Sequence, residues 1–171
     1  MEKAAPAITS SKLEKNIAVI GSYTTRILDK RDARLNNIHL AAERLDYEKV
    51  YPGEEFSFNG VLGKRTVKKG YEKAPIIIKT EKGPQKKYGM GGGICQLSST
   101  LYNATRKSDL KITERHSHSK TVGYVPKGRD AMVAYGSSDL KFINDRSHPI
   151  MIRVFVSDNH LTVKILENRN D

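Results

Sequence analysis

The sequence predicts an α+β fold, namely a strand-rich single domain with two main helices packed on a curved, mostly antiparallel sheet. The chain has 171 residues, about the length of one domain. Most of its patterned segments are short and strand-like, whereas only two segments carry helix signals. The clearest pattern lies near the C-terminus, where residues 150–157 and 160–166 alternate around Asp158-Asn159 and predict a β-hairpin.

The first half of the chain is predicted to place one helix between strands. Residues 16–22 are a short apolar strand candidate. Residues 31–45 have apolar side chains at the three-and-four spacing of an amphipathic helix. The segments 55–59 and 74–79 are predicted strands, and the polar residues 81–87 are predicted to form a hairpin or a loop.

The second half is predicted to begin with the other main helix, which runs from about residue 95 to residue 107. Further short strands are expected before the C-terminal hairpin, at residues 110–115, 122–125, 131–135 and 140–144.

The N-terminal residues 1–15 lack the apolar core of a signal peptide. We interpret them as a linker or an appended remnant and expect the domain to span residues 16–168. No apolar run approaches the roughly 20 residues that a membrane-spanning helix needs. The chain is therefore expected to be cytoplasmic or to be a domain separated from its targeting segment.

The charge balance favours anionic partners. Lysine and arginine exceed aspartate and glutamate by 30 to 19, a net charge of +11. Such a balance suits nucleic acid, a membrane surface or an anionic cell wall, with solubility as the simpler alternative. The chain has no tryptophan and no recognisable nucleic-acid motif, so nucleic acid is not expected as a partner. A single cysteine excludes an internal disulfide.

Residues 88–104 read YGMGGGICQLSSTLYNA and hold that only cysteine, Cys95, directly after three glycines. Glycine permits positive φ and close backbone approach. A cysteine in the first turn of the following helix would lie at the positive end of the helix dipole, which favours thiolate, and nearby N–H groups could hold an oxyanion. The alternatives are a small buried cysteine or a phosphate loop, but the phosphate-loop lysine is missing.

A nucleophilic thiolate needs a base, and the segment ERHSHSK offers His116 and His118. Alternate residues of an extended chain share a face, so these two could form a metal pair, with Cys95 as a third zinc ligand, or one base with a neighbour. Asp130 could orient the base or could pair locally with the adjacent Arg129.

Substrate contacts are expected from arginines and tyrosines around this segment. Arg65, Arg115 and Arg129 could bind a substrate carboxylate through a planar fork, or could belong to a solvated basic face. Tyr88 and Tyr124 are among the tyrosines that could wall a groove, although half-buried packing is the simpler interpretation.

Four blocks, PGEEFSFN, LGKRTVKKGYEKAPII, GGGICQLSSTLYNA and ERHSHSKTVGYVPKGRDAMVAYGSSDLKFIN, make the chain resemble a VanW-type domain. They occur in the family's order and cover nearly the whole chain. The resemblance implies an extracellular or cell-envelope domain working near peptidoglycan and associated with glycopeptide resistance. Some members are linked to L,D-transpeptidation, the cysteine-dependent 3-3 cross-linking of stem peptides, although the Ser-His-Gly-Cys motif of the best-known L,D-transpeptidases is absent.

The resemblance implies Cys95 as nucleophile and His118 as base, since the family's more regular histidine directly precedes serine in the HS pair. With Asp130 as the orienting group, the expected oxyanion amides are those of Gly92, Gly93, Ile94 and Gln96. The expected substrate contacts are Arg65, Tyr88, Ser98, His116, Tyr124 and Arg129.

The expected activity is thus peptidoglycan L,D-transpeptidation without a cofactor or metal. A cysteine peptidase or amidase on stem peptides and a non-catalytic wall-binding module are the alternatives. The expected partners are stem peptides and the anionic cell wall.

Overall fold

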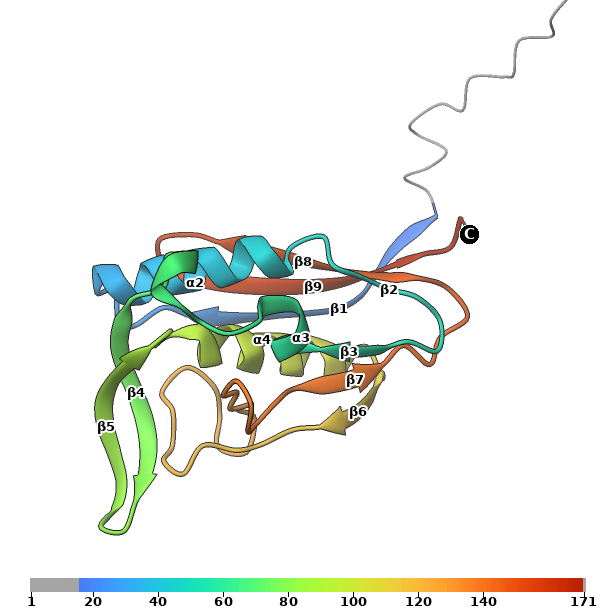
Figure 1. The fold of residues 1–171 in the computed structure, drawn as a ribbon. Helices are drawn as coiled ribbons and strands as arrows, with labels where there is room; N and C mark the ends of the chain where they lie inside the picture. Colours follow the sequence, from blue (N-terminus) through green and yellow to red (C-terminus); the bar gives the residue numbers. More distant parts are fainter. Residues whose placement is uncertain (1–15, 171) are drawn as a thin grey trace, which may run out of the picture.

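The structure is a computed structural model that describes residues 16–170. The expected linker at residues 1–15 lies outside the described residues. The described chain is an α+β domain with two substantial helices and mostly antiparallel strands, which confirms the predicted fold class. Figure 1 shows the helices, the main sheet and a ribbon that projects from the body.

The main sheet has the strand order β1-β9-β8-β2 and is antiparallel throughout. Its strands are β1 (Ile17–Arg26), β9 (His160–Asn168), β8 (Ile150–Val156) and β2 (Lys49–Val50). The predicted C-terminal hairpin is β8 and β9, which pair from Ile150↔Glu167 to Val156↔Leu161. Alternate residues of both strands are buried, because one face of this sheet lies beneath the helices.

Two helices cover that face. Helix α2 (Asp32–Leu45) packs on β8, helix α4 (Ile94–Lys107) packs on β1 and β9, and the two helices touch each other. Fully buried Ile38, Leu97, Leu101, Ile152 and Val163 form the centre of the core between helices and sheet. The two predicted helices at 31–45 and 95–107 are therefore found within one residue of their expected ends.

Two smaller sheets complete the domain. One has the order β3-β7-β6, formed by β3 (Glu55–Ser57), β7 (Lys141–Ile143) and β6 (Lys111–Glu114). The other is a two-stranded ribbon of β4 (Lys73–Thr80) and β5 (Gly83–Met90). A short helix, α3 (Phe58–Leu62), and a 3-10 turn (Val67–Lys69) connect β3 to the ribbon.

Several local predictions were wrong. Residues 122–125 and 131–135 are not strands; apart from one isolated bridge, Ala134↔Ser138, they form a loop. Residues 58–59 begin α3 instead of ending a strand. The polar residues 81–87 do lie in a hairpin, one of the two predicted alternatives, but most of them belong to the strand 83–90. The strands also form three separate sheets, not one curved sheet. None of the helices in the described residues is long and apolar enough to cross a bilayer.

Candidate active site

The glycine run connects β5 to α4 and allows a tight contact with the neighbouring elements. A Cβ on Gly92 would lie 2.5 Å from the backbone carbonyl of Ala74 in β4. Gly93 is the N-cap of α4 with φ 105°, and a Cβ there would lie 2.7 Å from the Arg34 side chain of α2. Only glycine fits both positions, and together they press the start of α4 against β4 and α2.

Cys95 is the second residue of α4 and is partly exposed. Its Sγ lies 3.5 Å from the carbonyl oxygen of Val133, and its side chain is near enough to His118 to raise the pKa of that imidazole. The residue is partly exposed and lies near an imidazole, so it is not sealed in the core.

His118 is held by Asp130. The Nδ1 of His118 lies 2.6 Å from Oδ2 of Asp130, and the backbone N–H of His118 donates to the same oxygen at 2.6 Å. The two side chains are 5% and 10% exposed. A carboxylate acceptor at Nδ1 fixes the tautomer that carries a proton there, so Nε2 is the nitrogen left for the thiol. The order of contacts is thiol, imidazole, carboxylate.

The surroundings shift the pKa values of His118 and Asp130 in opposite directions. Burial alone would lower the pKa of His118, but the hydrogen bond and charge of Cys95, followed by those of Asp130, outweigh burial and raise it. Burial would raise the pKa of Asp130, yet the hydrogen bonds from the backbone and ring of His118 outweigh it and lower it. The arrangement favours an imidazolium beside the Asp130 carboxylate.

Asp130 has an arginine partner, but it is Arg115 and not the adjacent Arg129. The Nη2 of Arg115 lies 3.2 Å from Oδ1 of Asp130, and its Nε donates to the backbone carbonyl of Asp130 at 2.7 Å. The Arg129 side chain is exposed, and its backbone carbonyl accepts a hydrogen bond from Asn103. Arg115 thus orients the carboxylate that orients His118.

The expected oxyanion amides need correction. The N–H groups of Gly92, Ile94 and Gln96 donate to the backbone carbonyls of Gly89, Gly91 and Gly93 and are therefore occupied. Within the described part of the chain, no acceptor is found for the amides of Gly93 and Cys95 itself. Of the four predicted donors only Gly93 has no acceptor among the described residues, and the amide of Cys95 joins it.

Ser98 also takes a different position from the one expected. It is fully buried, and its hydroxyl donates to the carbonyl of Ala131 at 2.6 Å. Ser99 accepts a hydrogen bond from the amide of Ala131, and Asn103 donates to the carbonyl of Arg129. These buried polar side chains of α4 attach the loop that carries Asp130, so Ser98 supports the site without reaching a substrate.

Arg34 is a site residue that the sequence prediction missed. It is buried, its Nη2 donates to Oε1 of Gln96 at 2.6 Å, and its Nη1 donates to the carbonyl of Asp29. Burial lowers its pKa, whereas the charges of Tyr124, Asp29 and Cys95 act in the opposite direction. A signal existed in the sequence, because Arg34 lies four residues before Ile38 on the apolar face of the predicted helix.

Arg65 and Tyr124 lie close enough to Cys95 to interact with its charge. Burial lowers the pKa of Arg65, and the charges of Tyr71 and Cys95 oppose this effect. Arg65 donates to Asn59 and to the carbonyl of Gly63, both at 2.8 Å. Burial and then the charge of Cys95 raise the pKa of Tyr124, so its phenol remains a proton donor.

Two other predicted contacts lie at the edge of this cluster. Tyr88 is exposed, and its hydroxyl accepts a hydrogen bond from Arg31 at 2.8 Å. His116 pairs with Glu114 at 2.9 Å and not with Asp130, so the two histidines do not form a pair. The described residues contain no group of three or more histidine, cysteine, aspartate or glutamate side chains placed to hold a metal ion.

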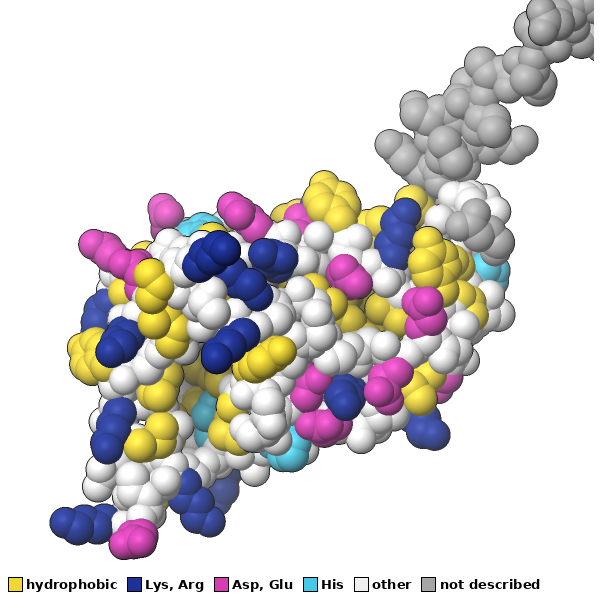
Figure 2. All heavy atoms as spheres, viewed as in Figure 1, with side chains coloured by type: hydrophobic (Ala, Val, Ile, Leu, Met, Phe, Trp, Pro, Cys, Tyr) yellow, Lys and Arg dark blue, Asp and Glu magenta, His cyan; other side chains and the backbone are white. Residues whose placement is uncertain are grey.

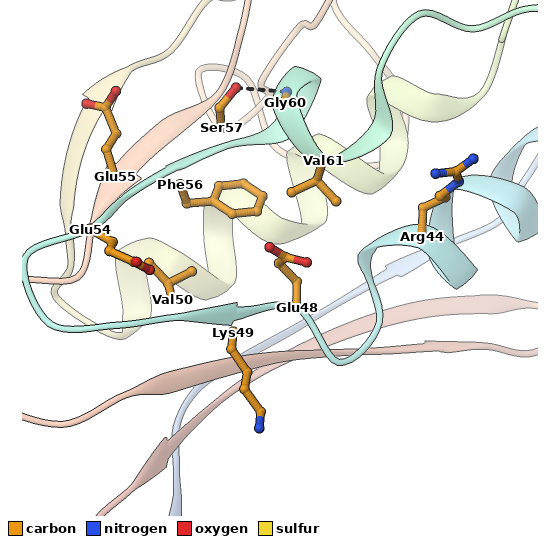
Figure 3. A pocket seen from close by; sticks show the side chains of 10 residues that line it. All are labelled: Arg44, Glu48, Lys49, Val50, Glu54, Glu55, Phe56, Ser57, Gly60 and Val61. Atoms are coloured by element: carbon orange, nitrogen blue, oxygen red, sulfur yellow. Dashed lines mark hydrogen bonds between the residues drawn. The ribbon is translucent and has the colours of Figure 1, made fainter. Parts of the chain in front are cut away.

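The largest groove of the described residues lies elsewhere. It has a volume of about 530 Å³ and is bordered by the end of α2, β2, β3 and α3. Figure 3 shows the Glu48 side chain directed towards Phe56 and Val61 in this groove. Burial and the charge of Glu54 raise the pKa of Glu48. None of the lining residues belongs to the Cys95 cluster.

The Cys95 cluster contains the groups that cysteine-dependent acyl transfer uses. They are a thiol, an imidazole with a fixed tautomer, a carboxylate behind it and free amides at a helix N-terminus. Buried Arg34 and half-buried Arg65 add positive charge near the thiol.

Comparison with known proteins places these residues in a family. The family described as VanW like protein matches residues 33–166. The chain is 48% identical over 134 residues to the protein YoaR of Bacillus subtilis, covering 78% of this chain and 43% of that protein. It is 26% identical over 144 residues to the Vancomycin B-type resistance protein VanW of Enterococcus faecalis, covering 81% and 51%.

The chain thus spans about half the length of each of these two relatives. No solved structure matches it. Because the family match covers most of the chain, including Cys95, His118 and Asp130, the chain belongs to the VanW-like protein family.

Proposed function

We propose that this chain is a cysteine-dependent L,D-transpeptidase that forms 3-3 cross-links between peptidoglycan stem peptides. The observation that carries the proposal is His118, held at 2.6 Å by Asp130 and near enough to Cys95 for the thiol to raise its pKa. One relative is by name a Vancomycin B-type resistance protein, which supports a substrate in the cell envelope.

In the first half-reaction, His118 takes the proton of the Cys95 thiol. The thiolate attacks the carbonyl between stem residues three and four and forms a tetrahedral oxyanion. The free amides of Cys95 and Gly93 stabilise that oxyanion, and each such donor is worth about 3 kcal/mol of barrier. His118 then gives its proton to the leaving amine, which releases the terminal D-residue and leaves a thioester.

In the second half-reaction, an acceptor amine attacks the thioester carbonyl. His118 takes a proton from that amine, the new amide bond forms, and the proton returns to the Cys95 sulfur. Water in place of the amine would give hydrolysis. Arg65, half-buried beside the site, supplies a guanidinium for the carboxylate of the donor's terminal residue.

The test is incubation of the protein with a purified disaccharide-tetrapeptide, followed by mass spectrometry. The expected product is a dimer lighter than two substrates by one free D-alanine, formed by the wild type and absent with Cys95→Ala. Tripeptide alone would assign a peptidase. A wild type without any product, whose thiol also fails to react with iodoacetamide, would assign a non-catalytic wall-binding module.

A further inference from the structure

The β4–β5 ribbon stands apart from the rest of the fold. Among the described residues its two strands pair only with each other. Figure 1 shows the ribbon projecting from the body beside the N-terminal end of α4. A two-stranded hairpin is marginally stable alone, so this ribbon depends on its base. There, Tyr88 accepts a hydrogen bond from Arg31, and Asn37 binds the carbonyl of Gly92 at 2.9 Å.

The ribbon is strongly basic. Residues 73–90 contain five lysines and one glutamate, and all five lysines are exposed. None of them forms a salt bridge with another described residue. Figure 2 shows lysine and arginine side chains along this projecting part of the surface. The unpaired positive charge is available to an anionic partner.

The strand register places several of these side chains together. Lys79 pairs with Pro84, Ile77 with Lys86, and Pro75 with Tyr88, and directly paired residues of antiparallel strands share a face. Lys79, Lys86 and the 65% exposed Tyr88 therefore lie on one face of the ribbon. Ala74, on the opposite face, is fully buried, so that face meets the body at the base.

The base of the ribbon continues into the helix that carries the thiol. Strand β5 ends at Met90, and Gly91, Gly92 and Gly93 connect it directly to the helix that begins with Ile94 and Cys95. A polymer lying along the ribbon would pass Tyr88 and reach the candidate active site at its base.

We propose that the Lys79–Lys86–Tyr88 face of the ribbon is a docking surface for the peptidoglycan strand itself, held through the carboxylates of stem peptides next to the one that enters the site. The inference rests on the proposed function for the substrate class. Charge complementarity calls for an anionic polymer, and continuity with the site favours the substrate polymer over the phosphate polymers of the wall.

The test measures binding of the Cys95→Ala protein to purified sacculi stripped of phosphate polymers with hydrofluoric acid. One triple variant carries Lys79→Gln, Lys82→Gln and Lys86→Gln. The matched control carries Lys49→Gln, Lys107→Gln and Lys111→Gln, three exposed lysines away from the ribbon, with the same loss of charge. Melting temperatures check that both variants fold.

We expect the ribbon variant to bind about tenfold more weakly than the control at low salt, with the difference shrinking as salt rises. Equal losses in the two variants would overturn the proposal, because binding would then follow net charge alone. Loss of all binding after stripping would also overturn it, because the partner would be a phosphate polymer. Because Cys95 is absent throughout, neither result depends on catalysis.

Discussion

At the scale of single residues, the site depends on the contacts that the Asp130 carboxylate makes. Its Oδ2 accepts two hydrogen bonds from His118, one from the ring and one from the backbone, and its Oδ1 lies beside Arg115. The carboxylate therefore fixes both the position of the residue and the tautomer of its ring. An asparagine at this position would have the same size as Asp130 but would no longer fix the tautomer of the His118 ring.

Asp130→Asn tests the orienting role. We expect kcat for cross-linking to fall by about 10³-fold or more, because the amide can present its NH₂ group to Nδ1 and favour the wrong tautomer. Steady-state kinetics on the disaccharide-tetrapeptide measure the loss. Asp158→Asn, at the exposed turn between β8 and β9, is the matched control and should change kcat less than twofold. Equal rates for the two variants would remove Asp130 from the mechanism.

The protonation of His118 is a second prediction at this scale. Its pKa is raised chiefly by Cys95 and then by Asp130, against the effect of burial. Because the folded pKa lies above the unfolded value near 6.5, the stability that this charge contributes is fully present below pH 6.5 and is lost as the pH rises through the folded pKa. In NMR titrations, Cys95→Ala should move the midpoint of His118 to lower pH. An unchanged midpoint would contradict the thiol–imidazole contact.

At the scale of elements, the helices were predictable and the loops of the site were not. The three-and-four spacing predicted α2, because that helix buries one face. Helix α4 was also predicted, although it is buried on most sides. Residues 131–135 resemble a strand in composition, but Ser98 and Ser99 of α4 bind the backbone of Ala131 and hold it as a loop. Strand β5 was missed because its residues are polar and mostly exposed, so no alternation marks it.

The site itself was partly predictable. Cys95, His118 and Asp130 followed from the glycine run, the histidine segment and the family resemblance, and the structure brings all three together. Arg34 was missed because an arginine within an amphipathic helix is usually exposed. Which amides remain free could not be predicted, because it depends on the turn that Gly91 and Gly93 form as acceptors.

The junction between β5 and α4 gives a prediction at this scale. Gly92→Ala would place a methyl group 2.5 Å from the carbonyl of Ala74, so either the ribbon or the start of α4 must move. We expect a loss of about 3 kcal/mol in the free energy of unfolding, measured by urea denaturation, and a lower rate of cross-linking. Gly123→Ala, whose nearest neighbour would be 3.7 Å away, should be close to neutral. Similar stabilities for the two variants would show that the close packing is not needed.

At the scale of the whole molecule, a buried carboxylate lies near the C-terminal end of β9, at the end of the main sheet opposite the candidate site (Figure 1). Glu167 of β9 is 3% exposed and forms salt bridges with Arg146 and Arg169. Arg146 lies in the loop between β7 and β8, so the contact joins that loop to the last strand. The hydrogen bond from Arg146 is the main cause that lowers the pKa of Glu167, to about 2.

The stability of the fold at acid pH should depend on the ionisation of Glu167. Because the folded pKa of Glu167 lies below its unfolded value, its contribution is present above about pH 4.5 and is lost as the pH falls through about 2. Glu167→Gln should therefore lower the free energy of unfolding by about 2–3 kcal/mol at pH 7, since both arginines lose their counter-ion. The difference from the wild type should shrink steadily between pH 5 and pH 2, as urea unfolding at each pH would measure. Glu81→Gln, at the exposed turn of the ribbon, should leave the profile unchanged. If the gap between Glu167→Gln and the wild type stayed constant with pH, the loss would come from packing and not from the charge of Glu167.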